Sequence, residues 1–387
     1  MTQKKKPVLR FKGFTDDWEQ RKLGELAEFN PKASLPDSFE YVDLESVVGT
    51  RIINHRTEKK DSAPSRAQRL AQPGDVFYQT VRPYQRNNCL FTGAEKSYVF
   101  STGYAQLRSH GDSYFLLTML QKDDFVNSVM DRCTGTSYPA INSNELAEIN
   151  VIFPTIIQEQ KELGQFFKNI DNLITLHQRK YEKLRNLKKF FLEKIFPQNG
   201  KRVPEVRFAG FTGDWEQRKI FELFKITRGH VLASPLISDT KTGDKPYPVF
   251  SSQTKNNGLM GYYKDYLYQD AITWTTDGAN AGTVNYRAEK FYCTNVCGVL
   301  LADKVIPNQM IAEALNKVAK RHVSYVGNPK LMNNVMADIE ITLPDDENEQ
   351  KRISYLFDKI DNLITLHQRK LEKLQNLKKA ALDKMFV

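Results

Sequence analysis

Two polar stretches of the chain contain side chains that can recognise the edges of nucleobases. The first follows a strand-like segment at residues 75–79, and the second follows a similar segment at residues 271–275. Arg can pair bidentately with guanine, and Asn or Gln with adenine. A polar hairpin without a ligand would have the same composition, so that interpretation stays open; Trp274 is expected in a core. The candidate DNA contacts are Gln79, Arg82, Tyr84, Gln85, Arg86, Asn87 and Asn88 in the first stretch, and Thr275, Asp277, Asn280, Asn285 and Arg287 in the second.

Two short loops could position a nucleic-acid backbone. Thr134-Gly-Thr-Ser-Tyr138 and Gly327-Asn-Pro-Lys330 each precede the final strand-like segment of their half of the chain. Hydroxyl and amide groups in such loops can lie against a phosphate, so Thr136, Ser137, Tyr138 and Lys330 join the candidate contacts. The lysines at 4–6 could neutralise phosphates, although a frayed arm is the commoner structure for such a segment.

The residue patterns that bring catalysis are missing. The chain has no GxxxxGK[ST] phosphate loop, no Asn-Pro-Pro-Tyr-like adenine pocket and no glycine-rich fingerprint for a methyl donor. Pro344-Asp345 with Glu349-x-Lys351 resembles a nuclease pattern, but it lies where a helix is expected to begin, and helix capping explains it better. We therefore expect no catalytic residue and no metal ligand. The cysteines, Cys89, Cys133, Cys293 and Cys297, form neither a disulfide framework nor a zinc-site pattern.

Composition fits a soluble protein with a polyanionic partner. Lys and Arg total 56 against 46 Asp and Glu, which gives a net charge of +10. Such an excess favours binding to nucleic acid, although many basic proteins bind none. No run of apolar residues is long enough for a membrane span, and the first residues do not resemble a secretory signal. We expect a cytoplasmic protein.

The most informative feature is an internal repeat. Residues 10–26 (RFKGFTDDWEQRKLGEL) return at residues 207–223 (RFAGFTGDWEQRKIFEL) with 13 of 17 positions identical, at an offset of 197. Residues 170–189 return at residues 360–379 at an offset of 190. Between these blocks the two copies diverge, over residues 27–145 and 224–335. Each half is therefore a constant frame that carries a variable insert, and this organisation suits two different recognition tasks.

The elements around the candidate contacts predict two strand-rich domains and two long helices. β-branched and aromatic residues gather in short segments between Gly- and Asn-rich turns in both inserts. A Pro-Thr-x-x-Gln segment at 154–158 and an acidic first turn at 345–347 are typical helix starts. The predicted parts are a first domain at 1–154, a first helix at 155–197, a second domain at 198–344 and a second helix at 345–387. The fold class is α+β with an internal pseudo-two-fold repeat.

Both predicted helices carry an apolar stripe with spacings of three and four residues. Such a stripe on a long polar helix predicts a coiled-coil seam. Because a globular domain separates the two helices, the economical arrangement is an antiparallel pair. His177 and His367 fall within the stripe, where a register-setting role is more common than metal binding. The predicted seam comprises Ile170, Leu173, His177, Leu184 and Leu187 in the first helix, and Ile360, Leu363, His367, Leu374 and Leu377 in the second.

This organisation resembles the specificity subunits of type I restriction–modification enzymes. The resemblance rests on the repeated RF-x-GFT-x-DWEQRK opening, the repeated IDNLITLHQRK helix, and Glu-Gln-Lys at 159–161 and 349–351. It implies two target-recognition domains, each of which reads one half of a split DNA site, held apart by antiparallel helices. It also implies two N6-adenine methyltransferase subunits and two restriction (translocase/nuclease) subunits as partners, in a system of phage defence. S-adenosylmethionine, ATP and Mg would belong to those partners, and this chain would be non-catalytic and hold no cofactor.

Two other functions stay open at this stage. A repeat scaffold outside restriction could bind proteins through its variable domains and dimerise through its helices. A self-sufficient DNA enzyme is disfavoured because the catalytic motifs are missing. A neighbouring gene for an adenine methyltransferase would favour the specificity subunit over the scaffold, and an assay of the purified chain alone would test the enzyme.

Overall fold

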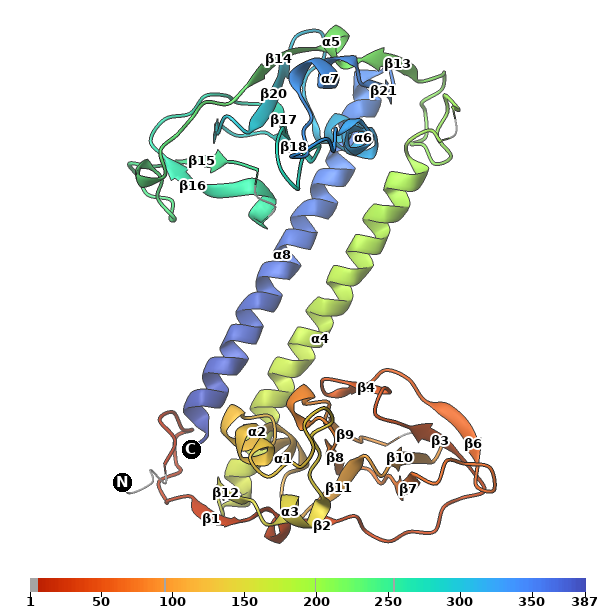
Figure 1. The fold of residues 1–387 in the computed structure, drawn as a ribbon, viewed down its shortest axis with the longest axis vertical. Coiled ribbons are helices and arrows are strands. Elements are labelled where there is room, and N and C mark those ends of the chain that lie inside the picture. Colours follow the sequence, from red (N-terminus) through yellow and green to blue (C-terminus); the bar gives the residue numbers. More distant parts are fainter. Residues whose placement is uncertain (1–5, 94, 199, 253–254) are drawn as a thin grey trace. The chain divides into compact units, whose positions relative to one another are not determined.

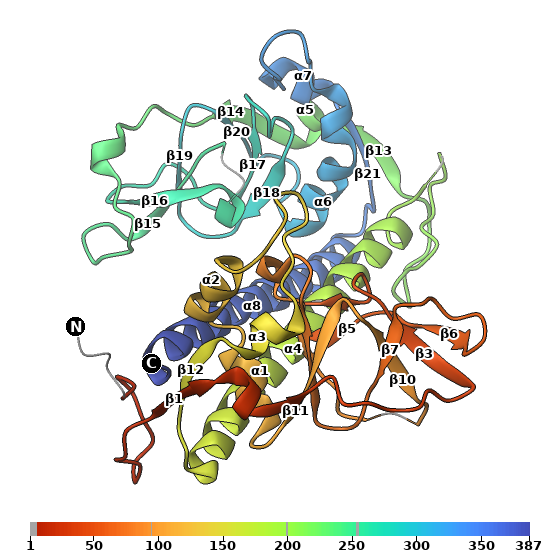
Figure 2. The same cartoon turned by 60° about the horizontal axis from the view of Figure 1, so that its bottom comes forward.

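The computed structural model describes residues 6–93, 95–198, 200–252 and 255–387. The chain divides into two compact units, Met1–Gln178 with Arg369–Val387, and Arg179–Gln368. Each unit therefore combines one strand-rich domain with segments of both long helices. Figures 1 and 2 label the elements of the two units.

The first domain contains two four-stranded sheets. One has the strand order β2-β11-β8-β9 and packs against short helices; the other has the order β6-β3-β10-β7 and lies farther from α4 in Figure 1. Strands β8 and β11 are almost fully buried, which agrees with their aromatic and β-branched composition. The strands are β1 (Glu19–Lys22), β2 (Ala27–Phe29), β3 (Ser38–Val42), β4 (Val47–Val48), β5 (Arg51–Ile52), β6 (Arg56–Lys59), β7 (Ala67–Leu70), β8 (Asp75–Gln79), β9 (Cys89–Leu90), β10 (Tyr98–Ser101), β11 (Tyr104–Ser109) and β12 (Asn150–Phe153).

Short capped helices close the first domain. The side chain of Asp112 accepts a hydrogen bond from the Phe115 amide at the start of α1, and Asn142 caps α3 in the same way through the Glu145 amide. The apolar side of α1 and α2 packs on β8 and β11 to form the main core of the domain. The helical elements are η1 (Leu23–Glu25), η2 (Pro83–Gln85), α1 (Ser113–Met119), α2 (Asp123–Met130) and α3 (Ser143–Ala147).

The second domain repeats this plan with different side chains. Its sheets have the strand orders β14-β20-β17-β18 and β16-β15-β19, and α6 packs on the first of them. Its strands are β13 (Glu216–Lys219), β14 (Phe224–Arg228), β15 (Tyr247–Phe250), β16 (Leu259–Tyr263), β17 (Ala271–Thr275), β18 (Val284–Arg287), β19 (Tyr292–Cys293), β20 (Cys297–Ala302) and β21 (Glu340–Leu343). Its helical elements are α5 (Ile220–Leu223), η3 (Ser234–Leu236), η4 (Lys255–Gly258), α6 (Gln309–Val318), η5 (Ala319–His322) and α7 (Asn333–Asp338).

The repeated opening sequence builds the same joint in both units. In the first unit Arg10 forms two hydrogen bonds of 2.6 and 2.7 Å with Glu159, which is 1% exposed. In the second unit Nε and Nη2 of Arg207 each donate a hydrogen bond of 2.7 Å to Glu349, which is 0% exposed. Strand β1 pairs with β12, and β13 pairs with β21, in equivalent registers. The repeat thus ties the opening segment and the last strand of each domain to the start of a long helix.

This joint also accounts for Glu349 of the nuclease-like pattern near residue 345. The Glu349 carboxylate is fully engaged with Arg207, and the Asp346 side chain accepts a hydrogen bond of 2.7 Å from the Asn348 amide. Glu349 therefore has a structural role at the start of a helix, and Asp346, the neighbour of Asp345, caps that helix; a capping role for Asp345 itself stays a prediction.

The two long helices are α4 (Ile157–Lys194) and α8 (Glu347–Met385). In the first unit Asp171 pairs with Lys378 and Phe167 contacts Phe386, so residue numbers rise along one helix as they fall along the other. In the second unit Lys188 pairs with Asp361 and Phe196 stacks on Phe357, which gives the same sense. The helix segments are antiparallel within each unit, and the predicted fold class is confirmed.

The predicted seam is wrong at four leucines. Leu173, Leu187, Leu363 and Leu377 are 39–50% exposed, so they lie beside the packed face. The packed positions alternate strictly by four and three residues, and Ile174, Lys188, Ile364 and Lys378 occupy the places assigned to those leucines. Adjacent residues differ by about 100° around a helix, so an error of one residue changes the face. Ile170, Ile360 and His367 are buried, while His177, Leu184 and Leu374 are half-buried.

Candidate nucleic-acid interface

In the first domain the candidate contacts gather where β8 ends. The chain leaves β8 through η2, and both residues that flank η2, Arg82 and Arg86, have a φ of 55°. The Arg82 amide donates a hydrogen bond of 2.7 Å to the Pro139 carbonyl, which brings the 134–140 loop beside η2. The Arg82 guanidinium lies 4.1 Å from the centre of the Tyr138 ring. The polar stretch after β8 and the loop at 134–140 thus lie side by side on one surface of the first domain.

Several of the predicted contacts instead stabilise the loop from inside. Gln79 and Asn88 are 2% and 1% exposed, and the Asn88 side chain accepts a hydrogen bond of 2.8 Å from the Gln79 amide. The Gln79 side chain donates to the Val81 carbonyl and to Gln85. Because both side chains are buried, they do not face solvent, and the expectation that they contact bases is corrected to a positioning role.

Two further candidates are partly occupied by intramolecular contacts. Arg86 forms an ion pair of 2.6 Å with Asp123 and donates to the Gln121 carbonyl. Asn87 accepts a hydrogen bond of 2.9 Å from the Gly49 amide. The side chains that face solvent with Arg82, which is itself half-buried, are Tyr84, Gln85, Thr136, Ser137 and Tyr138.

The second domain has the same backbone arrangement after β17. The Gly278 amide donates a hydrogen bond of 2.9 Å to the Pro329 carbonyl, as the Arg82 amide does to Pro139. Gly278 and Gly282 have φ values of 89° and 81°, so they occupy the left-handed positions that Arg82 and Arg86 hold in the first domain. Glycine adopts this conformation without steric cost, whereas arginine adopts it only at a steric cost.

The candidate side chains of the second domain are distributed between surface and interior. Asp277 accepts a hydrogen bond from Thr276 and lies 3.8 Å from Lys330, which is exposed. Thr275 is 6% exposed, so its predicted DNA contact is corrected to a buried position. Asn280, Asn285 and Arg287 line a small cavity beneath the loop.

Trp274 is 1% exposed, and its indole nitrogen donates to the Leu331 carbonyl at 3.0 Å, so it belongs to the core as predicted.

Sequence reasoning missed two surface residues of the second domain. Tyr325 and Val326 are 71% and 93% exposed in the loop that pairs Ser324 with Lys330. The corresponding loop of the first domain pairs Thr134 with Ala140. Alignment of the two loops through Pro139 and Pro329 would have identified them, because a loop that corresponds to a candidate loop is itself a candidate.

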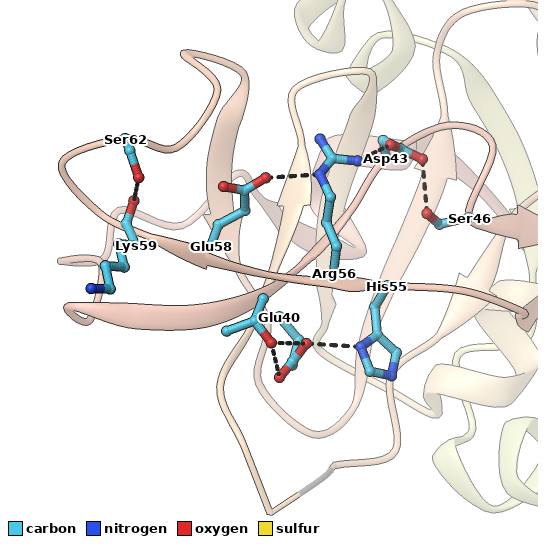
Figure 3. Close-up of polar contacts among 9 residues, drawn as sticks. Glu40, Asp43, Ser46, His55, Arg56, Glu58, Lys59 and Ser62 are labelled. Carbon is cyan, nitrogen blue, oxygen red and sulfur yellow. Dashed lines mark hydrogen bonds and ion pairs between the residues drawn. The ribbon is translucent and has the colours of Figure 1, made fainter.

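A second polar cluster lies on the outer sheet of the first domain (Figure 3). Glu40 on β3 is buried and contacts His55 at 2.9 Å, Thr57 at 3.0 Å and Lys96 at 2.8 Å. Hydrogen bonds from Lys96 and His55 lower the pKa of Glu40 to about 2. Nearby, Arg56 bridges Asp43 and Glu58. These contacts satisfy one another, so the cluster supports the outer sheet.

Chemistry outside these loops is limited in the described residues. Within residues 6–93, 95–198, 200–252 and 255–387, no group of three or more His, Cys, Asp and Glu could hold a metal ion. Cys89, Cys293 and Cys297 are buried, and burial raises the pKa of Cys297 to about 11. None of the helices in this described part is both long and apolar enough to cross a membrane.

The fold and the loops define a duplicated protein, in which one frame presents two sets of loops with different side chains. The family model of the type I restriction modification DNA specificity domain matches residues 15–186 and again residues 212–376. These two matches cover most of the chain, one for each repeat. The chain therefore belongs to the type I restriction–modification specificity family.

Individual relatives agree with this assignment. A Mycoplasma pneumoniae protein described as the N-terminus of a type I specificity subunit is 40% identical over 137 residues, which cover 34% of this chain and 71% of that protein. The specificity subunit of the M. pneumoniae type I restriction enzyme MpnII is 33% identical over 175 residues, 42% of this chain and 52% of the relative. The match thus spans about half the length of the MpnII subunit.

A solved structure shows the same fold. The crystal structure of a type I restriction-modification S subunit from M. genitalium superposes with a TM-score of 0.75 over 99% of both chains, at 14% sequence identity.

Proposed function

We propose that this chain determines the DNA sequence specificity of a type I restriction–modification enzyme, and that each domain reads one half of a bipartite site. One observation carries the proposal. The loops after β8 and β17 share their backbone pairing with a second loop, but they present different side chains. A fixed backbone with variable side chains suits two readers that recognise different bases. The alternative, a scaffold that binds proteins, has no comparable support now that the family is known.

The side chains of the first domain divide into two kinds of contact. Arg82 and Gln85 carry the donors and acceptors that base edges require, and Arg82 is not engaged by a carboxylate in the described part of the chain. Thr136, Ser137 and Tyr138 offer hydroxyl groups on an exposed loop, which suits contact with phosphates. In the second domain Asp277 and Lys330 bridge the two loops at the positions that Val81 and Ala140 hold in the first domain, and Tyr325 and Val326 are exposed in the second of these loops.

The helices provide surfaces for the partner subunits. Leu173, Leu176, Leu363 and Leu366 are 42–45% exposed, and the two pairs come from the repeated IDNLITLHQRK segment. Exposed leucines on an otherwise polar helix are typical of interaction surfaces. We propose that the duplicated surface docks two adenine methyltransferase subunits, and that two restriction subunits join the complex. S-adenosylmethionine, ATP and Mg would act in those partners.

An exchange of inserts tests the two-reader proposal. Residues 27–145 are replaced by the corresponding insert of a relative, and N6-methyladenine is mapped in cells that also express the methyltransferase subunit. We expect one half of the methylated motif to change and the other half to remain. The matched exchange of residues 224–335 should change only the other half. Simultaneous change of both halves in either exchange would contradict independent reading.

A further inference from the structure

The outer cores of the two domains differ at equivalent positions. In the first domain Phe77 stacks on Phe100 at 3.6 Å between ring centres, and Phe91 and Tyr104 complete an aromatic cluster. The strand registers of β8 with β9 and β11 match those of β17 with β18 and β20. The equivalent positions of the second domain hold Thr273 for Phe77, Asn285 for Cys89, Arg287 for Phe91 and Cys297 for Tyr104. At these positions Thr273, Asn285 and Arg287 replace apolar side chains, whereas Phe250 and Phe291 remain in an apolar cluster of the same domain.

Arg287 is half-buried and has no acidic partner among the residues that the structure describes. Its guanidinium carbon lies 3.6 Å from the centre of the Phe250 ring, and it donates to the Asn257 carbonyl at 2.6 Å and to the Thr273 hydroxyl at 3.3 Å. Among the described residues no carboxylate lies within ion-pair distance of it. Burial lowers the pKa of Arg287 to about 10. A partly buried cation without a counter-charge keeps part of the cost of desolvation, which an anion beside it would offset.

The space beside Arg287 is a small cavity of about 70 Å³ with both polar and apolar lining groups. This volume is several times the roughly 10–15 Å³ that one water molecule requires. Arg287 opens onto this cavity and is only half-buried, so small solutes can reach it. Hydroxyl and amide groups surround it, from Ser251, Thr273, Thr275, Asn280, Thr283 and Asn285.

We propose that Arg287 and the surrounding hydroxyl and amide groups form an oxyanion site that binds a phosphoryl group. A phosphate offers the negative charge that Arg287 lacks, and its oxygens can accept hydrogen bonds from several donors at once. The phosphoryl group could come from the DNA backbone or from free inorganic phosphate. The DNA source rests on the proposed function, whereas the site itself does not.

Thermal unfolding of the full chain tests the site without DNA. Melting is compared in inorganic phosphate and in chloride of equal ionic strength. We expect phosphate to raise the midpoint of the wild-type chain by about 2–4 °C at concentrations well above its dissociation constant. Arg287→Met should abolish this rise, Arg287→Lys should retain part of it, and Lys304→Met, which removes an exposed charge from the same domain, should retain all of it.

The same variants separate an oxyanion site from a structural arginine. In chloride Arg287→Met should melt close to the wild type, because removal of the partly buried charge offsets the hydrogen bonds lost at the Asn257 carbonyl and the Thr273 hydroxyl. A lower midpoint for Arg287→Met in chloride together with an unchanged phosphate effect would show that the arginine only supports Phe250, and would overturn the proposal. Absence of a phosphate effect in the wild type, with no change of DNA affinity in Arg287→Met, would overturn it as well.

DNA titration then identifies the source of the phosphoryl group. If a backbone phosphate occupies the site, Arg287→Met should weaken binding to all DNA sequences. It should also reduce the slope of the logarithm of the binding constant against the logarithm of the salt concentration by about one. If free phosphate occupies it, the phosphate effect on melting should vanish in the variant while DNA affinity and its salt dependence stay unchanged. Both results support the oxyanion site. If the chain did not read DNA at all, the effect of phosphate on the melting midpoint would still test the site.

Discussion

The loops after β8 and β17 follow the same backbone path but differ in almost every side chain. Both turn through two left-handed positions and both donate a main-chain hydrogen bond to a proline carbonyl in a neighbouring loop. The second domain fills the left-handed positions with Gly278 and Gly282, while the first domain fills them with Arg82 and Arg86. A non-glycine residue held in this conformation costs about 1–2 kcal/mol. The first domain is therefore less stable at these two positions than the second, and in exchange it carries arginine side chains at the loop.

We expect the largest loss in the free energy of unfolding from substitutions in the frames that hold these loops. Arg207→Met leaves the buried Glu349 without its partner, so we expect a loss of about 3–5 kcal/mol in the free energy of unfolding of the second domain. Arg10→Met should cost about 1 kcal/mol less in the first domain, because the Trp18 indole still donates to Glu159. Denaturant unfolding followed by tryptophan fluorescence checks both values.

The double variant Arg207→Met with Glu349→Leu is the control for that experiment. It removes the charge that would be left unpaired, so most of the lost stability should return. Equal losses in the single and double variants would contradict the assignment of the effect to an unpaired carboxylate.

The strained arginine should show opposite effects on stability and on DNA binding. Arg82→Gly relieves the left-handed strain, so we expect the first domain to gain about 0.5–1 kcal/mol. The same change removes a guanidinium from the proposed interface, so specific DNA binding by the assembled enzyme should weaken by about 1–3 kcal/mol. Unfolding and DNA titration measure the two quantities.

Gly278→Ala provides the matched control in the second domain. A Cβ at this position meets no atom within 4 Å, so the only cost is the backbone strain at a φ of 89°. We expect a loss of about 1 kcal/mol in the free energy of unfolding, with little effect on the first half-site. A gain in stability for Gly278→Ala, or a loss for Arg82→Gly, would contradict the comparison of the loops.

We expect the smallest change in stability from pH, through Glu40 on the outer sheet of the first domain. The pKa of Glu40 is lowered to about 2, so its contacts with Lys96 and His55 stabilise the fold above the ordinary glutamate pKa. This stabilisation should be lost as the pH falls from about 4.5 towards 2. Thermal melting of the wild type and Glu40→Gln should therefore converge over this range, and a constant difference between them would contradict the assignment.

The sequence predicts the frame well because the repeat itself carries the information. Identical blocks at an offset of 197 identify the joint that contains Arg10 and Arg207, and the sustained apolar stripe identifies the long helices. It fails at Leu173 and Leu187, because the apolar character of a leucine does not report its rotation about the helix. It also fails at Gln79, Asn88 and Thr275, because polar residues next to a strand can face inwards as readily as outwards.

The division of the chain into units has a consequence for folding during synthesis. Residues 179–368 form a continuous unit, whereas the first unit combines residues up to 178 with a segment that begins at residue 369. Phe386 packs on Trp18, Phe115 and Phe167, so the core of the first domain is completed by residues made about 200 positions after the helix that it packs on. Contacts at such sequence separation form slowly. We therefore expect the core of the first domain to be completed only after residue 386 has been translated, so that the apolar surface covered by Phe386 stays open to aggregation until then.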